Sequence, residues 1–575
     1  MKKLFIAAMA LATIVSCSKD GIDAPATPST GSEVAKLAVS LQTVKTRADY
    51  NYTNGDDLEH EVNSIDFYLF ADGDAYNGAD GHNRVSVDME TLEDWTLKAD
   101  DGNNITKTSD IILVIAKEKN VVPTHIVAVI NATADYKGLD LAELQSAVAE
   151  DLQTDLGFVM SNSVYDSETE TGVVVATEIK PENIFVDTES TDEAGEAGEA
   201  YTGKIGVAPV QIYVERVAAK VKVSSKVADD NGFIPVKDEN GDAMEDTFIK
   251  VLGWEITNAT SASYLLKSYD AEKPYFSDLN VPAAFRSHWA TTKPQTVGHT
   301  LTFSHIADLK NDGKNALVLD AYNYYHENTL TATNAEGWFN EVVEVTGAEG
   351  YAGTATQSPQ LIVAAQLVDA NGKAKEFGTW YGKTYENVNG LKAAMINNAA
   401  KQIFVIESTD DPKTEEKEPT VLRSISVGDV VFYQVDDQTS YQATDWNGDF
   451  RHEVRVMADK DKKYYDAKGE SMEAEDVTAI LEKTEPAMIW TSGYTYYYTL
   501  IKHYAVGQTQ LHGMVRNHVY DVNITGVNGF GTPVYEPYNH IITPEPPKEQ
   551  DGFSLTAEIN VLAWAVVEND VELGN

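Results

Sequence analysis

The 575-residue sequence contains a single cysteine and about half as many basic as acidic residues, and it has no long apolar run beyond its first residues. One cysteine excludes an intrachain disulfide, so stability must come from packing or assembly. With 44 Lys+Arg against 90 Asp+Glu, the net charge is −46. A chain this acidic repels phosphate backbones, so we expect no nucleic-acid partner. A hydrophobic content of 43% nevertheless excludes a disordered polyanion and predicts a sizeable core.

Motifs of catalysis are also missing. The sequence has no His-Glu-x-x-His, Gly-x-Ser-x-Gly or Walker-type pattern, and its only thiol lies near the N-terminus. The richest carboxylate cluster comprises Asp72, Asp74, Asn77, Asp80 and Asn83. It lacks the spacing and the final Glu of an EF-hand, so we expect a solvated turn, and a Ca²⁺ site is the alternative. Among 90 carboxylates some pair always suits glycoside hydrolysis, so pairing alone carries no weight. We therefore predict no enzyme, no catalytic residue, no metal and no cofactor.

The N-terminus has the pattern of an export signal. Met1-Lys2-Lys3 precedes an apolar run from Leu4 to Val15, and Ser16-Cys17 follows. A small residue before the only cysteine is typical of a bacterial lipoprotein. We expect a signal peptide over 1–16 and lipidation of Cys17, which would anchor the chain to the outer membrane without spanning it. A buried cysteine behind a simple signal peptide is the alternative.

A short strand and a basic site follow a polar tether. Apolar residues at every second position predict a half-buried strand, and they are Ala35, Leu37, Val39 and Leu41. Lys45-Thr46-Arg47 stands where this strand meets a polar segment that begins with Ala48. Strand-to-loop junctions are sites that proteases cut, although Arg47 on local evidence is also an ordinary surface residue.

The body of the chain predicts a mainly β protein with minor helices. Strand-like runs occur at 65–70, 111–116, 125–130, 158–160 and 210–223. One helix is expected after the N-cap Asp140, with Leu141, Leu144, Val148 and Leu152 on one face. From about 228 to 535, Asn-Gly and Asp-Gly pairs separate many short β runs, with helices near 391–400 and 477–483. We predict two β-sandwich-like (transthyretin-like) domains, over 48–227 and 228–535.

The C-terminal segment, 536–575, combines a spacer with a strand. Five of the eighteen prolines lie between 533 and 547, which favours an extended spacer. Apolar residues then alternate at Phe553, Leu555, Ala557, Ile559, Val561, Ala563, Ala565 and Val567. Such a strand must be paired, because an exposed apolar strand aggregates. It either folds back into its own domain or completes the sheet of another subunit.

Taken together, these segments resemble a known family. The chain is similar to the major subunits of the short fimbriae of Bacteroidales, a branch of the type V pilins, in the Cys17 lipobox, in the Pro-rich spacer and at 45–48, 66–70, 125–133, 214–220, 496–498, 516–524 and 559–573. The resemblance implies that an Arg-specific surface protease cuts between Arg47 and Ala48. The propeptide 17–47 would leave with its strand, and the C-terminal strand of another subunit would fill the groove. Removal of 1–47 would take away six basic and three acidic residues and leave a net charge of −49.

The resemblance also implies the biological role. It predicts a shaft subunit of a surface fimbrium that supports adhesion and biofilm formation, a trait associated with virulence. Expected partners are further copies of the chain, anchor and tip subunits, the protease, and host or bacterial surface proteins. The alternatives are an anchor or tip subunit, a monomeric surface lipoprotein that binds glycan or protein, and an exported glycosidase or peptidase.

Overall fold

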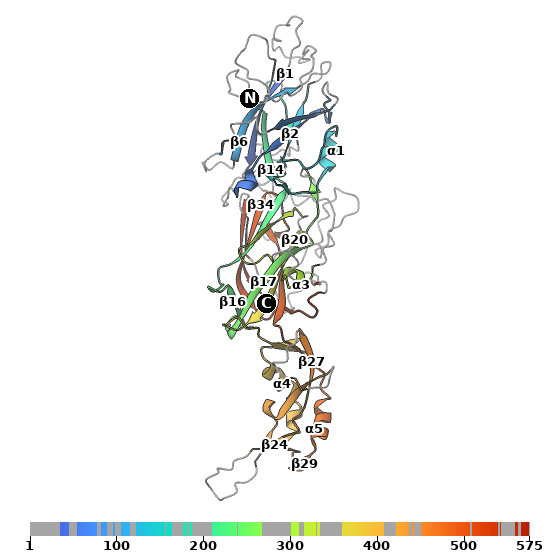
Figure 1. Cartoon of the computed structure of the whole chain (residues 1–575), viewed down its shortest axis with the longest axis vertical. Helices are drawn as coiled ribbons and strands as arrows, with labels where there is room; N and C mark the ends of the chain where they lie inside the picture. Colours follow the sequence, from blue (N-terminus) through green and yellow to red (C-terminus); the bar gives the residue numbers. More distant parts are fainter. Residues whose placement is uncertain are drawn as a thin grey trace.

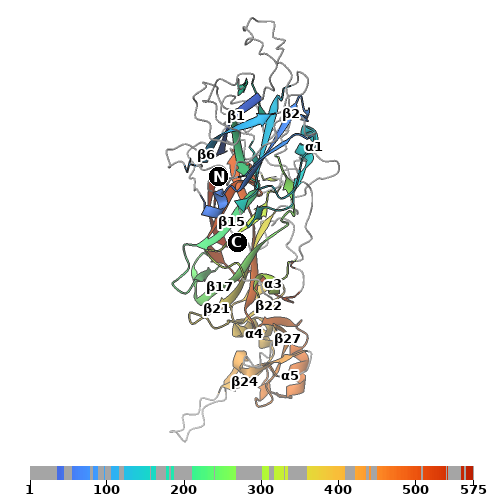
Figure 2. The ribbon, with the colours of Figure 1, turned by 45° about the horizontal axis from the view of Figure 1, so that its top comes forward.

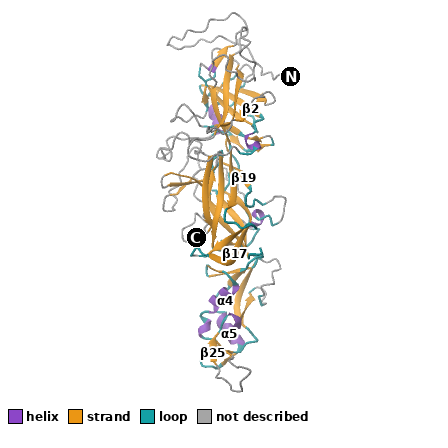
Figure 3. Ribbon diagram, turned by 90° about the vertical axis from the view of Figure 1, so that its left-hand side faces the viewer, coloured by secondary structure: helices purple, strands orange, loops and turns teal. Residues whose placement is uncertain are grey.

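The chain is elongated, with sheets following one another along its long axis (Figure 1). The computed structural model describes residues 35–44, 55–77, 82–88, 96–97, 105–115, 122–155, 157–163, 176–180, 183–186, 210–238, 240–266, 301–309, 316–328, 331–333, 359–407, 421–435, 440–441, 450–506, 509–538, 541, 558–561 and 565–573. Strands predominate throughout (Figure 3), which confirms the prediction of a mainly β chain with minor helices. In the described part, no helix is long and apolar enough to cross a membrane.

The first sheet lies at the N-terminal end of the long axis and has eleven strands. Its main path runs in the order β3 (Asp74–Ala75), β2 (Ser64–Ala71), β7 (His125–Ile130), β11 (Met160–Asn162), β14 (Val210–Arg216), β1 (Ala35–Val44), β6 (Ile105–Ile115) and β5 (Thr96–Leu97). Three further strands pair at its sides: β4 (Arg84–Asp88), β12 (Thr177–Glu178) and β13 (Ile184–Val186). Short pairs join β9 (Gln153–Thr154) to β10 (Gly157–Phe158), and β8 (Val148–Ala149) to β18 (Ser263–Tyr264).

The second sheet fills the middle of the molecule and has ten strands. Its path is β19 (Tyr322–His326), β15 (Ala218–Ser225), β34 (His518–Asn528), β16 (Phe233–Lys237), β17 (Ala243–Thr257), β21 (Gln360–Val368), β31 (Tyr494–Leu500) and β35 (Thr532–Pro533), with β36 (Glu558–Val561) and β37 (Ala565–Leu573) joined to β34. Beside it lie the helix α3 (Phe303–Ile306) and a three-stranded sheet of β20 (Thr331–Thr333), β33 (Thr509–His512) and β32 (Lys502–Val506).

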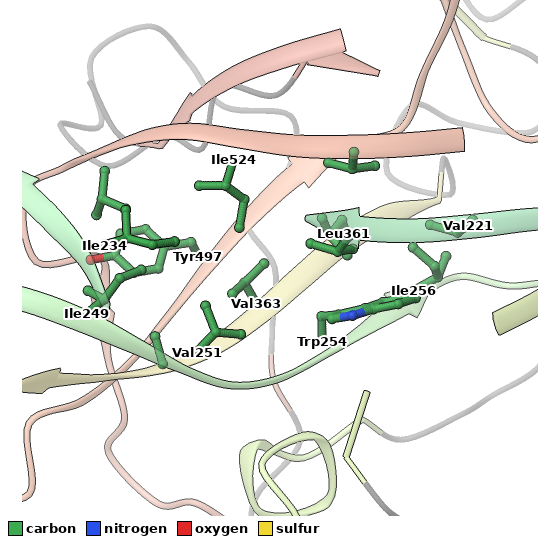
Figure 4. Packing of buried hydrophobic residues seen from close by; sticks show 14 of the residues in the cluster. Val221, Ile234, Ile249, Val251, Trp254, Ile256, Leu361, Val363, Tyr497 and Ile524 are labelled. Atoms are coloured by element: carbon green, nitrogen blue, oxygen red, sulfur yellow. The ribbon is translucent and has the colours of Figure 1, made fainter. Parts of the chain in front are cut away.

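Apolar side chains converge between the strands of the middle sheet. Figure 4 shows Trp254 and Ile256 of β17 beside Leu361 and Val363 of the neighbouring strand β21, with Ile524 of β34 above Val363. The indole of Trp254 donates a hydrogen bond from Nε1 to the carbonyl oxygen of Val318, so its polar atom is satisfied. Burial of each such side chain stabilises the fold by about 1.5–3 kcal/mol before entropy is subtracted.

The third part of the chain is inserted between two neighbouring strands of the middle sheet. β21 and β31 pair with each other, yet residues 369–493 separate them in sequence. Residues 369–491 are here named the inserted module, and their described part forms the end of the molecule opposite the first sheet (Figure 2). They contain a five-stranded sheet of β23 (Lys383–Tyr385), β22 (Phe377–Trp380), β30 (Ala487–Trp490), β27 (Arg451–Ala458) and β26 (Val430–Gln434), and a four-stranded sheet of β25 (Val421–Ser424), β24 (Phe404–Glu407), β28 (Tyr464–Tyr465) and β29 (Ser471–Met472).

Two helices cover the core of the inserted module. Leu391 of α4 (Val388–Ile396) and Val477 of α5 (Ala474–Leu481) are buried in one cluster with Val454 and Val456 of β27. The range 228–535, which we expected to form one sandwich-like domain, therefore contains a buried cluster in the middle sheet and another in this module. The predicted domain boundaries stay predictions.

The helix predicted after Asp140 is present but shorter than expected. In α1 (Leu141–Ser146), Asp140 caps the N-terminus through a 2.8 Å hydrogen bond that its carboxylate accepts from the Glu143 amide. The helix ends at Ser146, and Val148 begins β8. The helical spacing of apolar residues therefore extends past the end of the helix, to Val148 and beyond. There the pairing of β8 with β18 decides the backbone conformation.

Candidate assembly site

The strand predicted to be removed lies inside the first sheet and not at its edge. β1 runs parallel to β14 on one side and antiparallel to β6 on the other (Figure 1). Val39 is level with Val210, and Leu41 with Ile212. Val210 and Ile212 are buried, and parallel neighbours at one level share a face of the sheet. Ala35 and Leu37 pair with Val186 and Ile184 of β13. Loss of β1 would therefore open a gap between β14 and β6 above a buried apolar layer.

The chain is anchored again shortly after β1 ends. A 3₁₀ helix, η1 (Asp57–His60), carries Glu59, whose side chain is buried. One carboxylate oxygen of Glu59 accepts hydrogen bonds from Lys220 Nζ at 2.6 Å and from the Tyr324 hydroxyl at 2.5 Å. The backbone carbonyl of Glu59 accepts a hydrogen bond from Arg216 Nε. Thr43 of β1 is level with Val214, so the chain is fixed near the C-terminal end of β14 on both sides of residues 45–55.

Burial shapes the electrostatics of this anchor. Burial lowers the pKa of Arg216 to about 10, and the nearby Glu59 carboxylate acts in the opposite direction. Burial, reinforced by the hydrogen bond to Glu59, raises the pKa of Tyr324 well above its ordinary value. At neutral pH, Arg216 is therefore charged and Tyr324 keeps its proton, as their hydrogen bonds to Glu59 require.

A bent strand connects the first sheet to the middle sheet. β14 and β15 follow one another with Val217 between them, and the Val217 amide donates a hydrogen bond to the Val159 carbonyl at 3.0 Å. Across this bend, Arg216 Nη1 donates to the Asn517 side-chain oxygen at 2.9 Å. The Asn517 amide donates to the Ala218 carbonyl at 2.7 Å. The strand that contacts β1 is thus joined to the residues that begin β34.

A fully buried ion pair fixes the start of β34. Arg516 Nη2 lies 2.6 Å from Glu327 Oε1, and both side chains have no exposed surface. Arg516 Nη1 also donates to the Leu265 carbonyl at 2.8 Å. Burying two charges is costly, and the pair is tolerated because Arg516 also donates to backbone carbonyls and Glu327 Oε2 accepts from the Arg516 amide.

Replacing Arg516 by Met should destabilise the middle sheet by about 3–5 kcal/mol, because Glu327 would be left buried without its counter-charge. Urea unfolding followed by tryptophan fluorescence measures the loss. Arg84→Met is the matched control, since the Arg84–Asp135 pair is partly exposed and should cost less than about 1 kcal/mol. Adding Glu327→Leu to Arg516→Met should recover part of the loss. A single variant as stable as the Arg84 control would contradict the assignment.

The C-terminal strands pair with β34 of their own chain. β37 runs parallel to β34, from His518 level with Ala565 to Val527 level with Leu573. β15 pairs with residues 519–524 of the same strand, so it occupies the opposite edge of β34. The donor prediction assigned Ile559 and Val561, which lie in β36, and Ala565 and Val567, which lie in β37. Phe553, Leu555, Ala557 and Ala563 lie outside the described residues.

The C-terminal apolar pattern is divided between two strands. β36 and β37 pair antiparallel with each other, with Val561 level with Val567. One continuous strand was the simpler expectation from the alternation. A period of two specifies the faces of a strand but not a reversal of chain direction, so the sequence pattern continued across the break.

The predicted lipidation and cleavage residues lie outside the described part of the chain, whereas most of the carboxylate cluster lies within it. Cys17, Arg47 and Ala48 lie outside the described residues. Asp72 and Gly73 form the turn between β2 and β3, and the Asn83 side chain bonds to the backbone of residues 138 and 139. Within the described ranges, no three His, Cys, Asp or Glu side chains are grouped as a metal ion would need.

Sequence reasoning missed the buried charges. Arg216 and Arg516 stand inside two segments used for the family resemblance, 214–220 and 516–524, and a charged residue within an apolar strand pattern is a usable signal. Nothing in the sequence around Glu59 distinguishes it from the other acidic residues, because its burial depends on Lys220 and Tyr324, far along the chain.

Comparison with known proteins places the resemblance in the C-terminal part. Residues 488–570 match the family described as major fimbrial subunit protein type IV, fimbrillin, C-terminal. This range contains β31, β34, the spacer, β36 and part of β37. No curated protein matches the chain.

The chain is also distantly similar to several solved structures. A fimbrilin from Porphyromonas gingivalis is 12% identical over 94% of this chain and 97% of its own, with a TM-score of 0.32. A cell adhesion protein from Parabacteroides distasonis is 11% identical over 94% of this chain and 98% of its own, also with a TM-score of 0.32. A C-terminally truncated tip fimbrial protein from Porphyromonas gingivalis is 11% identical over 68% of this chain and 100% of its own, with a TM-score of 0.22. The family match over residues 488–570 confirms the resemblance to fimbrial subunits in this part of the chain.

Proposed function

We propose that the chain is the shaft subunit of a surface fimbrium. It is exported as an outer-membrane lipoprotein through Cys17 and is cut between Arg47 and Ala48. It then polymerises when the C-terminal strand of a second copy takes the place of β1. The observation that carries the proposal is the interior position of β1 between β14 and β6, in a sheet whose other strands come from later in the chain.

The position of the predicted cleavage point supports this proposal. Residues 45–55 connect two points near the same end of β14, and eleven residues can extend over about 35–40 Å. Loops that follow a strand are sites at which proteases cut, and the predicted cleavage point lies in this connection. After the cut, hydrogen bonds and packing alone would retain β1, while Glu59 would keep the new N-terminal region on the body.

The pairing of the C-terminal strands supports the exchange. β1 has a parallel neighbour, β14, and an antiparallel neighbour, β6. β37 likewise has a parallel neighbour, β34, and an antiparallel one, β36. A strand that already uses one parallel and one antiparallel edge can make the same two kinds of ladder in the place of β1.

The second candidate function is a monomeric surface lipoprotein that binds glycan or protein. The observation in its favour is the pairing of β37 with β34 of the same chain, which leaves the C-terminal strand with a partner inside the monomer. In the fimbrial proposal this pairing is a resting state, which protects an apolar strand until a second copy offers a groove.

The N-terminal residue of protein recovered from the cell surface distinguishes the two. We expect Ala48, read by Edman degradation or by mass spectrometry of the terminal peptide. Acylated Cys17 on all of the surface protein would contradict the shaft proposal and favour an anchor subunit or a monomeric lipoprotein. In the shaft proposal the remaining partners are further copies, anchor and tip subunits and the Arg-specific protease, and adhesion to host or bacterial surface proteins follows from the assembled fibre.

A further inference from the structure

The inserted module packs against the middle sheet where the chain leaves the body toward its C-terminal strands. Phe377 of β22 stacks on Phe530 with ring centroids 5.5 Å apart and planes inclined by 11°. Its other ring neighbour is Trp490 of β30, at 6.2 Å. Both Phe377 and Trp490 belong to the buried cluster of the middle sheet. The module therefore continues the body and does not hang from a flexible link.

The first residues of the Pro-rich spacer cross this attachment. The Arg451 guanidinium lies 3.4 Å from the ring centroid of Tyr535, and Arg451 Nη2 lies 3.7 Å from Glu536 Oε1. Trp490 meets Tyr535 edge to face at 6.3 Å. The Ile541 amide then donates to the Leu301 carbonyl at 2.8 Å, which fixes the first part of the spacer on the body.

Two tyrosines on this segment remain open to solvent. Tyr535 is 53% exposed and Tyr538 is 51% exposed, although Arg451 and Trp490 hold one face of the Tyr535 ring. Large aromatic side chains that are fixed on one face and exposed on the other are typical of interaction surfaces. We name the surface made by Arg451, Tyr535 and Tyr538 the spacer-base surface.

The length of the spacer limits where a second copy can sit. From Ile541 to Phe553 the chain spans at most about 40 Å. The N-terminal unit of a second copy, residues 48–227, has a radius of gyration of about 16 Å and hence a diameter of about 40 Å. Because the chain from Ile541 to Phe553 is about as long as that unit is wide, a groove within its reach brings the unit close to Ile541.

The distribution of charge favours the same contact. Residues 48–227 carry 35 acidic and 12 basic residues, a net charge of −23. The inserted module carries 24 acidic and 15 basic residues over 123 positions, a net charge of −9. A strongly acidic unit is repelled less by this end of the molecule than by a second acidic unit.

We propose that the spacer-base surface is a second contact between successive copies in the fibre, covered by the N-terminal unit of the copy that receives the strand. This inference rests on the proposed polymerisation and adds to it a surface contact that does not involve strand exchange. Through this contact the inserted module contributes to the interface between successive subunits.

Single-cysteine labelling tests the proposal. The mature chain from Ala48 contains no cysteine, because Cys17 is the only one, so Tyr538→Cys introduces a unique thiol. We expect maleimide to label this thiol several-fold more slowly in fibres than in unpolymerised subunits. Val318→Cys is the matched control, since Val318 is 47% exposed on the body, and its labelling should be similar in both states.

The possible results separate the two proposals. Fibres in which Tyr538→Cys reacts as fast as in the subunit would overturn the spacer-base contact and leave strand exchange intact. Absence of any polymer from the unsubstituted mature chain would overturn the proposed function and this contact with it. As a second readout, Tyr538→Ala should leave subunit melting unchanged but accelerate loss of subunits from fibres by about tenfold or more. An unchanged rate of loss would also count against the contact.

Discussion

Arg47→Ala should arrest the chain as a lipidated monomer that forms no fibre. Uncut, β1 competes for its own groove at an effective concentration in the millimolar range, because it is tethered to the body. A donor strand on another molecule competes at a far lower concentration and has to break ladders to β14, β6 and β13. Cleavage removes the tether, and a displaced β1 then diffuses away. The expected result is complete loss of heat-resistant ladders on a denaturing gel.

The control and the rescue for this variant use the same chain. Arg84→Ala removes another arginine, which forms an ion pair with the exposed Asp135, and this variant should polymerise normally. Inserting the recognition sequence of an added protease in place of 45–47 should restore polymer when that protease is supplied. If Arg47→Ala forms heat-resistant ladders by itself, the cleavage model is wrong.

A chain that ends at residue 552 should be cut normally and yet fail to elongate. The deletion removes β36 and β37, which contact β34, while the buried cluster of the first sheet is built from residues that remain. The truncated subunit should therefore keep a functional groove. It should accept a donor strand from an intact copy and offer none in return.

Mixing experiments sharpen this second prediction. Small amounts of the truncated subunit should shorten fibres made by the intact chain, in proportion to the amount added, as measured by electron microscopy. Glu558→Gln is the matched control, because it alters a position outside the alternating apolar set. Fibres of normal length from the truncated chain alone would refute the donor assignment, since growth would then not need residues 553–575.

Local sequence patterns predicted the elements whose environment is simple. The apolar runs at 65–70 and 125–130 are the paired strands β2 and β7, and the cap at Asp140 begins a helix. Alternation over 35–41 identified β1 before any pairing was known. These succeed because burial of one face and capping of a helix end are decided by neighbouring residues.

Features that depend on distant residues could not be predicted. No pattern marks the separation of β21 from its partner β31 by the inserted module, since pairing ignores distance along the chain. The same limit applies to the Arg516–Glu327 ion pair and to the anchoring of Glu59. The reversal between β36 and β37 was missed because alternation reports faces and not direction.

The bent strand from Val210 to Ser225 has a mechanical consequence. Its first half borders the place of β1, and its second half lies parallel to β34, which contacts the C-terminal strand. In a fibre under tension, force entering at the groove would pass along one covalent backbone into the middle sheet. There it would load the β15–β34 ladder lengthwise, so that many hydrogen bonds resist together instead of opening one after another. A subunit built in this way transmits tension along its length through one continuous strand. The hydrogen bond between Arg216 and Asn517 stabilises the bend in that strand.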